Sequence, residues 1–315
     1  MEVSGLMAKD ARLVRDSHQK EIVKLFSAFD GSKNRRKIFE DFVVMTACMY
    51  SNLADLDHRE EREQMYMDHA KQYRKSELDI FAKMIAEIVM GMEDNPDQDF
   101  LGEMYMALDF GSSAAGQFFT PYSVCQCMAA ILSDFDMLKA KIDDRGFVSV
   151  NDPACGAGAL LMAFANESLR SGINPQTQIL FTAQDIDFTV GCMCYIGMCV
   201  RGLAGYVVIG DTLCNPSTSY DRRGLLPVDK GNIWYTPMFL ARLEWAGRRM
   251  AASMDLMFSG GRKEKPAETT LAQPPAPPVA VKAPEPVMIL PEPEAQQTVP
   301  EPLYSETGFG QLTFF

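Results

Sequence analysis

The feature that most constrains the fold of this chain is a strand-like run that ends in an acid and leads directly into a glycine-containing turn and an apolar helix. The segment reads FVSVNDPACGAGALLMAFANESL. Gly156 and Gly158 let the backbone approach a ligand closely, and the helix that begins near Ala159 points its positive end at the same place. The pattern is typical of nucleotide-type sites, although tight strand-to-helix turns also use glycine for steric reasons alone.

Two further strand-like runs end in acids. QILFTAQDID gives a second strand ending in Asp185 and Asp187, and YVVIGDTL gives a third strand ending in Asp211. Strands that alternate with helical runs predict an α/β fold with a parallel sheet and helices on both faces. Three carboxylates at one edge of such a sheet fit an adenosyl ligand lying across the strand ends, although an acid in this place can also simply cap the following helix.

These segments resemble the cofactor motifs of a known family. GQFFTP (Gly116 to Pro121), DPACGAG (Asp152 to Gly158), QDID and GDTL are similar to successive motifs of the adenine-N6 DNA methyltransferases, especially the modification subunit of type I restriction systems. The preceding FLGEMYMALDFGSSAA resembles the helix that leads into GQFFTP in that family. The resemblance covers about a third of the chain. It implies a Rossmann-like S-adenosylmethionine-dependent methyltransferase fold with S-adenosyl-L-methionine as cofactor.

The resemblance also implies a role for each matching position. Phe118 and Thr120 would lie beside the methionine moiety, and Asp152 with its glycine turn would face the same end. Asp185 would accept the ribose hydroxyls, and Asp211 would receive the adenine amino group. The predicted cofactor-binding set is Gly116, Gln117, Phe118, Phe119, Thr120, Pro121, Asp152, Pro153, Ala154, Cys155, Gly156, Gly158, Asp185, Ile186, Asp211 and Thr212.

The catalytic motif of that family has no clean counterpart here. Methylation of a flipped adenine needs an aromatic ring to stack on the base and polar groups to hold its amino group; the family uses an Asn or Asp, two prolines and an aromatic residue. Asn215-Pro216 lacks the second proline and the aromatic residue. We therefore predict a divergent clamp in which Asn232 acts with Trp234 or Tyr235, although both prolines are missing there.

The chain divides into four parts by composition. Residues 1–110 predict a helical N-terminal domain, and 111–260 the methyltransferase-like domain, whose sheet we expect to be incomplete. An unpaired sheet edge must then be covered by the following helix, by a dimer mate or by another protein. Residues 261–302 are rich in proline and predict a disordered linker. We predict that residues 303–315, with their apolar and aromatic tip, form a terminal interaction peptide.

The last five residues suggest a partner. Gln311, Leu312, Thr313, Phe314 and Phe315 resemble the short peptide with which bacterial replication and repair proteins bind the sliding clamp. Such peptides place apolar side chains in a preformed pocket. The alternative is that the tip folds back onto its own domain. We favour the clamp because the proline-rich arm makes back-folding costly.

The net charge of −12 limits how this chain can hold DNA. Neutralising phosphates supplies most non-specific affinity, so we expect DNA contacts to come largely from a partner subunit. The sequence contains no long uncharged apolar run and no secretory signal, which predicts a cytoplasmic protein without a membrane span. The eight cysteines lack the spacing of a metal site, so no metal is expected.

Two main hypotheses remain. The first is an adenine-N6 DNA methyltransferase of the type I modification-subunit kind. The second is a catalytically degenerate cofactor-binding accessory or regulatory subunit, such as one encoded by a phage or mobile element and tethered to the sliding clamp. Methylation of RNA or protein is a third reading, because the cofactor site is shared among these enzymes.

Overall fold

The computed structural model describes most of the chain. The described residues are position 14, 16–108, position 110, 119–132, 134–228, 232–259, 304–306 and 311–314. For positions 132, 232 and 259 and for the last two segments, the backbone alone is described. The proline-rich segment 261–302 lies outside the described residues. No helix in the described part of the chain is long and apolar enough to cross a membrane.

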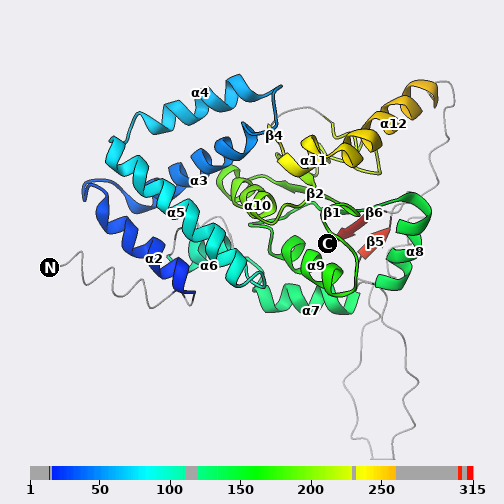
Figure 1. Cartoon of the computed structure of the whole chain (residues 1–315), viewed down its shortest axis with the longest axis horizontal. Helices are drawn as coiled ribbons and strands as arrows, with labels where there is room; N and C mark the ends of the chain where they lie inside the picture. Colours follow the sequence, from blue (N-terminus) through cyan, green and yellow to red (C-terminus); the bar gives the residue numbers. More distant parts are fainter. Residues whose placement is uncertain are drawn as a thin grey trace, which may run out of the picture.

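The first part of the chain is helical, as its apolar spacing predicts (Figure 1). Its helices are α2 (Ser17–Leu25), the 3-10 turn η1 (Phe26–Ala28), α3 (Arg35–Ser51), α4 (Arg59–Ala70), α5 (Lys75–Asp94) and α6 (Phe100–Ala107). Polar caps set several of their starts: the side chain of Asp16 accepts hydrogen bonds from the first turn of α2, and Asn34 does the same for α3.

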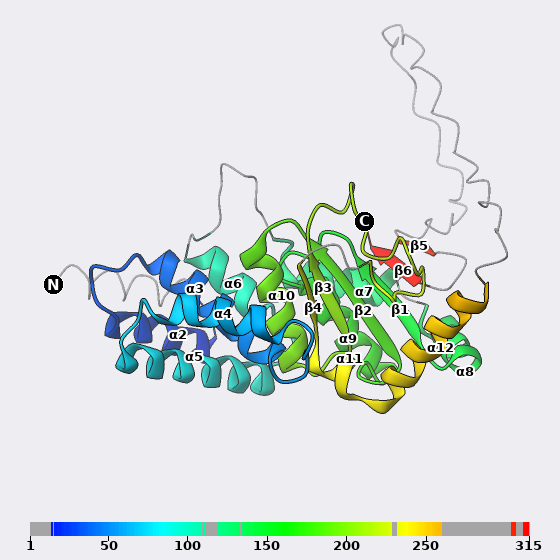
Figure 2. The same ribbon diagram turned by 90° about the horizontal axis from the view of Figure 1, so that it is seen from above.

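Strands and helices alternate in the second part. The order is α7 (Tyr122–Leu132), α8 (Phe135–Arg145), β1 (Val148–Asp152), α9 (Ala159–Arg170), β2 (Ile179–Asp185), α10 (Phe188–Val200), β3 (Gly205–Ile209), β4 (Asn232–Tyr235), α11 (Pro237–Ala241), α12 (Leu243–Ser259), β5 (Tyr304–Glu306) and β6 (Gln311–Phe314). The strands form one sheet in the order β4-β3-β2-β1-β6-β5 (Figure 2). β1, β2, β3 and β6 run parallel, whereas β4 and β5 run antiparallel to their neighbours.

The register brings the predicted acids to one edge of this sheet. Asp152 pairs with Ala183 of β2, and Asp185 pairs with Ile209 of β3, directly before Gly210 and Asp211. All three parallel strands therefore end at the same edge. The predicted Rossmann-like α/β fold is confirmed.

The two faces of the sheet pack against different helices, because alternate residues of a strand point to opposite faces. Phe181, Val207 and Trp234 belong to a core that continues into the helical part, where α3 packs on α10. Leu180 and Tyr206 belong to a second core that includes residues of α11 and α12. The helical part and the sheet thus share one hydrophobic core.

The C-terminal peptide does not lie as the sequence analysis favours. The backbone of β6 pairs with β1, with Gln311 opposite Ser149 and Thr313 opposite Asn151. We expected an open sheet edge to be covered by the following helix, by a dimer mate or by another protein, but the edge of β1 is covered by residues 311–314 of the chain itself. In the structure the peptide has therefore folded back, which is the alternative to a free clamp-binding tip. The expectation underestimated how many backbone hydrogen bonds the open edge of β1 offers.

Candidate cofactor site

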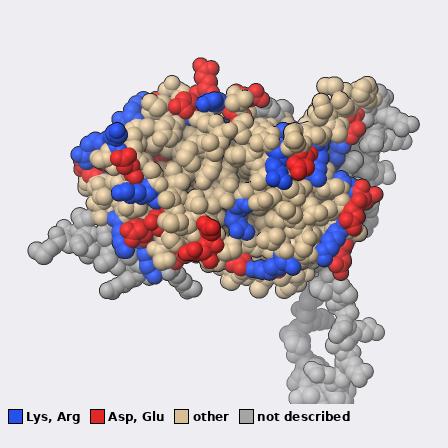
Figure 3. Space-filling view, viewed as in Figure 1, with Lys and Arg blue, Asp and Glu red and all other residues tan. Residues whose placement is uncertain are grey.

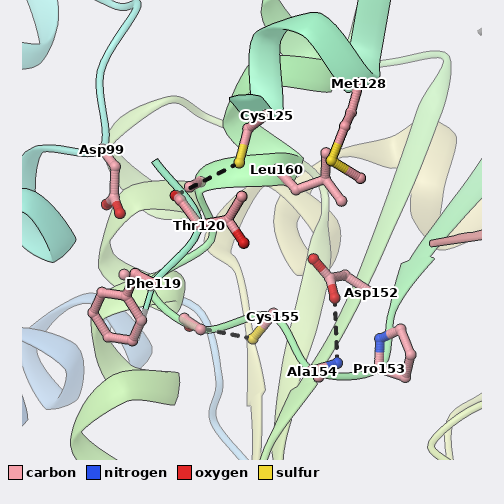
Figure 4. A pocket seen from close by; sticks show the side chains of 13 residues that line it. Asp99, Phe119, Thr120, Cys125, Met128, Asp152, Pro153, Ala154, Cys155 and Leu160 are labelled. Carbon is pink, nitrogen blue, oxygen red and sulfur yellow. Dashed lines mark hydrogen bonds between the residues drawn. The ribbon is translucent and has the colours of Figure 1, made fainter. Parts of the chain in front are cut away.

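A cavity of about 180 Å³ lies at the carboxyl end of β1 (Figure 4). The turn after β1 forms one side, the start of α9 and the side of α7 form others, and the loop before α7 closes it. Its described lining residues are Asp99, Phe119, Thr120, Cys125, Met128, Asp152, Pro153, Ala154, Cys155, Gly156, Ala157, Ala159 and Leu160. Seven of the sixteen predicted cofactor residues are among them.

Two glycines shape the turn after β1. Gly156 has φ +55°, and a Cβ there would lie 3.4 Å from the ring of Phe119. Gly158 has φ +93°, and a Cβ there would lie 2.9 Å from the Sγ of Cys194 on α10. Both backbones occupy a conformation that L side chains rarely adopt, and at Gly158 the close approach to α10 adds a steric demand. The geometry therefore shows the steric reason for glycine that the sequence analysis gave as the alternative, and close approach to a ligand stays a prediction.

Asp152 is a buried acid at the cavity wall. Its side chain is 7% exposed, and its Oδ1 accepts a hydrogen bond of 3.2 Å from the N–H of Ala154. Burial raises the pKa of the Asp152 carboxyl to about 6, and the charge of Asp185 adds to this effect. A carboxylate in such a place favours a ligand that carries positive charge near it.

Asp185 connects the end of β2 to the glycine turn. Its Oδ2 accepts the N–H of Gly156 at 2.9 Å, and its Oδ1 accepts the N–H of Asp187 at 2.9 Å. A carboxylate has about four acceptor sites, so capacity remains for ribose hydroxyls. The neighbouring Ile186 is 74% exposed, although large apolar side chains are usually buried, and so offers an apolar surface beside Asp185.

Asp211 lies outside this cavity. It is exposed and lines a neighbouring cavity of about 330 Å³ together with Gln184, Ile209 and Asn215. A hydrogen bond from the Cys214 thiol and backbone N–H donors lower the pKa of the Asp211 carboxyl. The next residue, Thr212, contacts the wall of the first cavity, because its hydroxyl donates to the carbonyl oxygen of Pro153 at 2.6 Å.

The loop before α7 is described in part. Phe119 and Thr120 line the cavity, and the Phe119 ring stacks on Tyr105 of α6 with 5.8 Å between centroids. Pro121 lines a larger neighbouring cavity instead. The predicted residues Gly116, Gln117 and Phe118 lie outside the described residues.

Comparison with known proteins supports what the motifs indicate. Residues 96–231 match the family model described as N-6 DNA methylase. This segment belongs to the N-6 DNA methylase family. It contains the cavity and the turn, together with the ends of β1, β2 and β3. No curated protein sequence matches the chain.

Two solved structures resemble parts of this chain. One is a Listeria monocytogenes protein described as a class I S-adenosylmethionine-dependent methyltransferase, with 17% identity over 58% of this chain and 55% of that one, at a TM-score of 0.32. The other is the type I restriction-modification system methyltransferase subunit from Streptococcus thermophilus, with 12% identity over 66% and 59%, at a TM-score of 0.30. This chain spans less than two thirds of either structure.

The structure does not bring the three predicted catalytic residues together. The Trp234 side chain is fully buried, with the Arg62 guanidinium 3.6 Å from its ring centroid. Tyr235 lies at the other end of β4 from Asn232, because it pairs with Tyr206 near the start of β3. Asn232 pairs with Ile209 and so lies at the cofactor edge, but its side chain lies outside the described residues. A clamp that combines Asn232 with either aromatic residue finds no support in this arrangement.

Several residues of the cavity were not predicted from sequence. Cys125 and Met128 lie on α7 and Leu160 lies on α9, and Asp99 is the residue directly before α6. Asp99 directly precedes the FLGEMY segment that carries part of the family resemblance, and this was the one available signal. An acid before a helix is normally interpreted as a cap, which concealed its second position at the cavity wall.

Proposed function

We propose that this chain binds S-adenosyl-L-methionine at the cavity beside β1 and is the cofactor-binding part of an adenine-N6 DNA methyltransferase of the type I modification-subunit kind. The observation that carries the proposal is the turn from Asp152 to Gly158, whose left-handed glycines and link to Asp185 form a cradle at the sheet edge. The family match covers the same segment.

The described residues fit the chemical groups of this cofactor. Asp152 and the Gly156 turn would face the sulfonium end, because a buried carboxylate favours a cation. Asp185 would accept the ribose hydroxyls, with Ile186 packing on the adenine. Asp211 would receive the adenine amino group. When bound, the cofactor supplies an electrophilic methyl group, and the protein's part is to position it and to keep water away.

DNA as the substrate fits the family but not the charge of this chain. The net charge is −12, and on the face shown in Figure 3 basic and acidic side chains are interspersed among uncharged ones. We propose that a partner subunit supplies most phosphate contacts. A DNA substrate agrees with the cytoplasmic location that the sequence predicts.

The first experiment is a calorimetric titration of the full chain with S-adenosylmethionine, with Asp152→Ala as the test variant. Asp144→Ala is the matched control, because Asp144 is an exposed acid on α8 away from the cavity. We expect the wild type and the control to bind and Asp152→Ala to lose most of its affinity. Equal binding by all three proteins would refute the assigned site.

A second step separates enzyme from accessory subunit. Tritiated cofactor is incubated with unmethylated DNA and the protein, with and without an extract of cells that encode it. Label in N6-methyladenine identifies the enzyme. Binding without label in either case supports the degenerate accessory subunit, which is favoured by the burial of Trp234 beneath Arg62.

The sliding clamp is the proposed partner of the C-terminal peptide only in a state where β6 has left β1. A pull-down with purified clamp, comparing the full chain with one that lacks residues 304–315, tests this. Retention of the full chain alone would support the tether. If the clamp retains both chains equally, or neither of them, residues 311–314 are not a clamp-binding peptide and serve only as strand β6 of the sheet.

A further inference from the structure

The cavity beside β1 contains negative groups at two separate places. Asp152 lies at the end of β1, and Asp99 lies across the cavity in front of α6 (Figure 4). Cys125 lies near both: burial raises the pKa of its thiol to about 12, and the charges of Asp99 and Asp152 contribute. The described lining residues include no lysine, arginine or histidine. The cavity is therefore suited to a ligand with more than one cationic centre.

Asp99 has acceptor capacity that its helix-capping contact does not use. Its Oδ1 accepts the N–H of Gly102 at 3.0 Å, and the described residues give Oδ2 no donor. A Cβ on Gly102 would lie 2.0 Å from that Oδ2, so glycine makes room for the carboxylate. The side chain is 6% exposed, and burial together with the nearby charge of Glu103 raises the pKa of the carboxyl to about 7. A buried carboxylate without a counter-charge is costly, and a bound cation would remove that cost.

Gln19 provides an independent sign of a missing donor nearby. It is completely buried on α2 and lines the larger cavity of about 610 Å³, which shares Asp99, Phe119 and Thr120 with the first. Its Nε2 donates to the carbonyl oxygen of Phe100 at 2.8 Å, which fixes the orientation of the amide. Its Oε1 has no hydrogen-bond partner among the described residues. An unpaired buried acceptor is rare in folded proteins and indicates a site for a donor.

We propose that Asp99 is the residue that binds the α-ammonium group of the cofactor's methionine moiety, with the Gln19 carbonyl as a second acceptor. A primary ammonium has three N–H donors, and both acceptors border the larger cavity, which Asp99 shares with the cavity beside β1 and Gln19 lines from α2. Asp152 then faces the sulfonium centre at the other end. This inference rests on the proposed function, because it assigns a subsite of the same cofactor.

The test compares two adenosyl thioethers, both of which lack the sulfonium charge. S-adenosylhomocysteine carries the amino-acid part, and 5′-methylthioadenosine lacks it. In the full chain, Asp99→Asn removes the charge but keeps an acceptor for the Gly102 N–H, because asparagine is as good a helix cap as aspartate. We expect the Kd for S-adenosylhomocysteine to rise about 10- to 100-fold and the Kd for 5′-methylthioadenosine to stay within about twofold.

Asp134→Asn is the matched control. Asp134 caps α8 and accepts the N–H of Met137 at 3.0 Å, yet it does not line the cavity. We expect this variant to bind both ligands as the wild type does. Asp99→Ser, which also retains a capping oxygen, repeats the test if the first variant is poorly folded.

The outcomes distinguish the subsite from the proposed function. Unchanged affinity for S-adenosylhomocysteine in Asp99→Asn would overturn the inference, and so would an equal loss for both ligands, which would indicate a structural role. A wild type that binds both ligands equally well would overturn the ammonium subsite and leave the adenosyl site intact. A wild type that binds neither would refute the proposed function itself.

Discussion

The cofactor edge of the sheet and the region predicted to hold the target base differ in how their residues assemble. At the cofactor edge, residues from three distant motifs meet around one turn, because parallel strands end together and Asp185 bonds directly to the Gly156 backbone. In β4, the three predicted catalytic residues lie within four positions, yet they separate. Trp234 enters the core, and Tyr235 lies at the far end of the strand from Asn232. The shared end of neighbouring parallel strands thus predicted which residues lie together better than closeness in the sequence did.

The largest effect is expected at the glycine turn. Gly158→Ala places a Cβ 2.9 Å from Cys194 at φ +93°, whereas Gly172→Ala meets nothing within 4 Å at φ +82°. We expect Gly158→Ala to lower the free energy of unfolding by about 2–4 kcal/mol and to abolish cofactor binding. Gly172→Ala should cost only about 1 kcal/mol, from backbone strain, and should bind normally.

Urea unfolding and calorimetry on both variants check this expectation. Equal losses in the two proteins would mean that the contact with α10 is unimportant and that only the backbone conformation matters.

The link between β2 and the turn should give the next largest effect. Asp185→Asn leaves one oxygen to serve two backbone N–H donors, so one donor loses its partner. We expect a loss of about 2 kcal/mol in unfolding free energy and at least a tenfold loss of cofactor affinity. Asp187→Asn is the control, because asparagine can still cap α10 by accepting from Val190. If cofactor affinity falls equally in both variants, Asp185 has no special role.

The buried carboxyl of Asp152 should make the unfolding free energy depend on pH. The pKa of Asp152 is raised from 3.8 to about 6 in the folded state, so the fold holds this proton more tightly than the unfolded chain does. The carboxylate therefore destabilises the protein above pH 6, and the effect disappears as the pH falls toward 4. We expect Asp152→Asn to raise the unfolding free energy by about 2 kcal/mol at pH 8 and to change it little at pH 4.

Denaturant unfolding at both pH values measures this difference. A variant that is no more stable than the wild type at pH 8 would show that Asp152 is well solvated, against its burial.

The smallest effect is expected in β4, the strand that was predicted to hold the target base. Trp234→Phe should lower stability by about 1–2 kcal/mol, because it removes core volume and weakens the contact with the Arg62 guanidinium. Cofactor affinity should not change. If the protein proves to methylate DNA, the methylation rate should also be unaffected once the protein is folded. If a stable, cofactor-binding Trp234→Phe protein loses DNA methylation, Trp234 does contact the target base as predicted from the sequence.

The sequence was sufficient to group residues at the ends of neighbouring parallel strands. Asp152, Gly156 and Gly158 lie in the turn after β1, and Asp185 ends the adjacent strand β2, so their meeting could be predicted, whereas their roles in cofactor binding stay predictions. The place of Asp99 at the cavity wall could not be predicted, because an acid directly before a helix is explained by its capping hydrogen bond alone. Trp234 was misleading, since both faces of β4 are covered: Trp234 packs in the core shared with the helical part and Ile233 in the core beside α11 and α12.

The pairing of β6 with β1 was also beyond sequence reasoning. Residues 311–314 follow a long proline-rich segment, and strand pairing across such a distance leaves no local pattern. The apolar tip suggested a partner, and in the structure the partner is the chain's own sheet.

Hydrogen–deuterium exchange of the full chain, measured with and without S-adenosylmethionine, decides whether the cofactor binds at the carboxyl end of β1. We predict that the cofactor slows exchange in the Asp152–Gly158 turn and around Asp185, with no change in the loop between α3 and α4. Unchanged exchange in the turn at saturating cofactor, or protection confined to other regions, would contradict a cofactor site at the carboxyl end of β1.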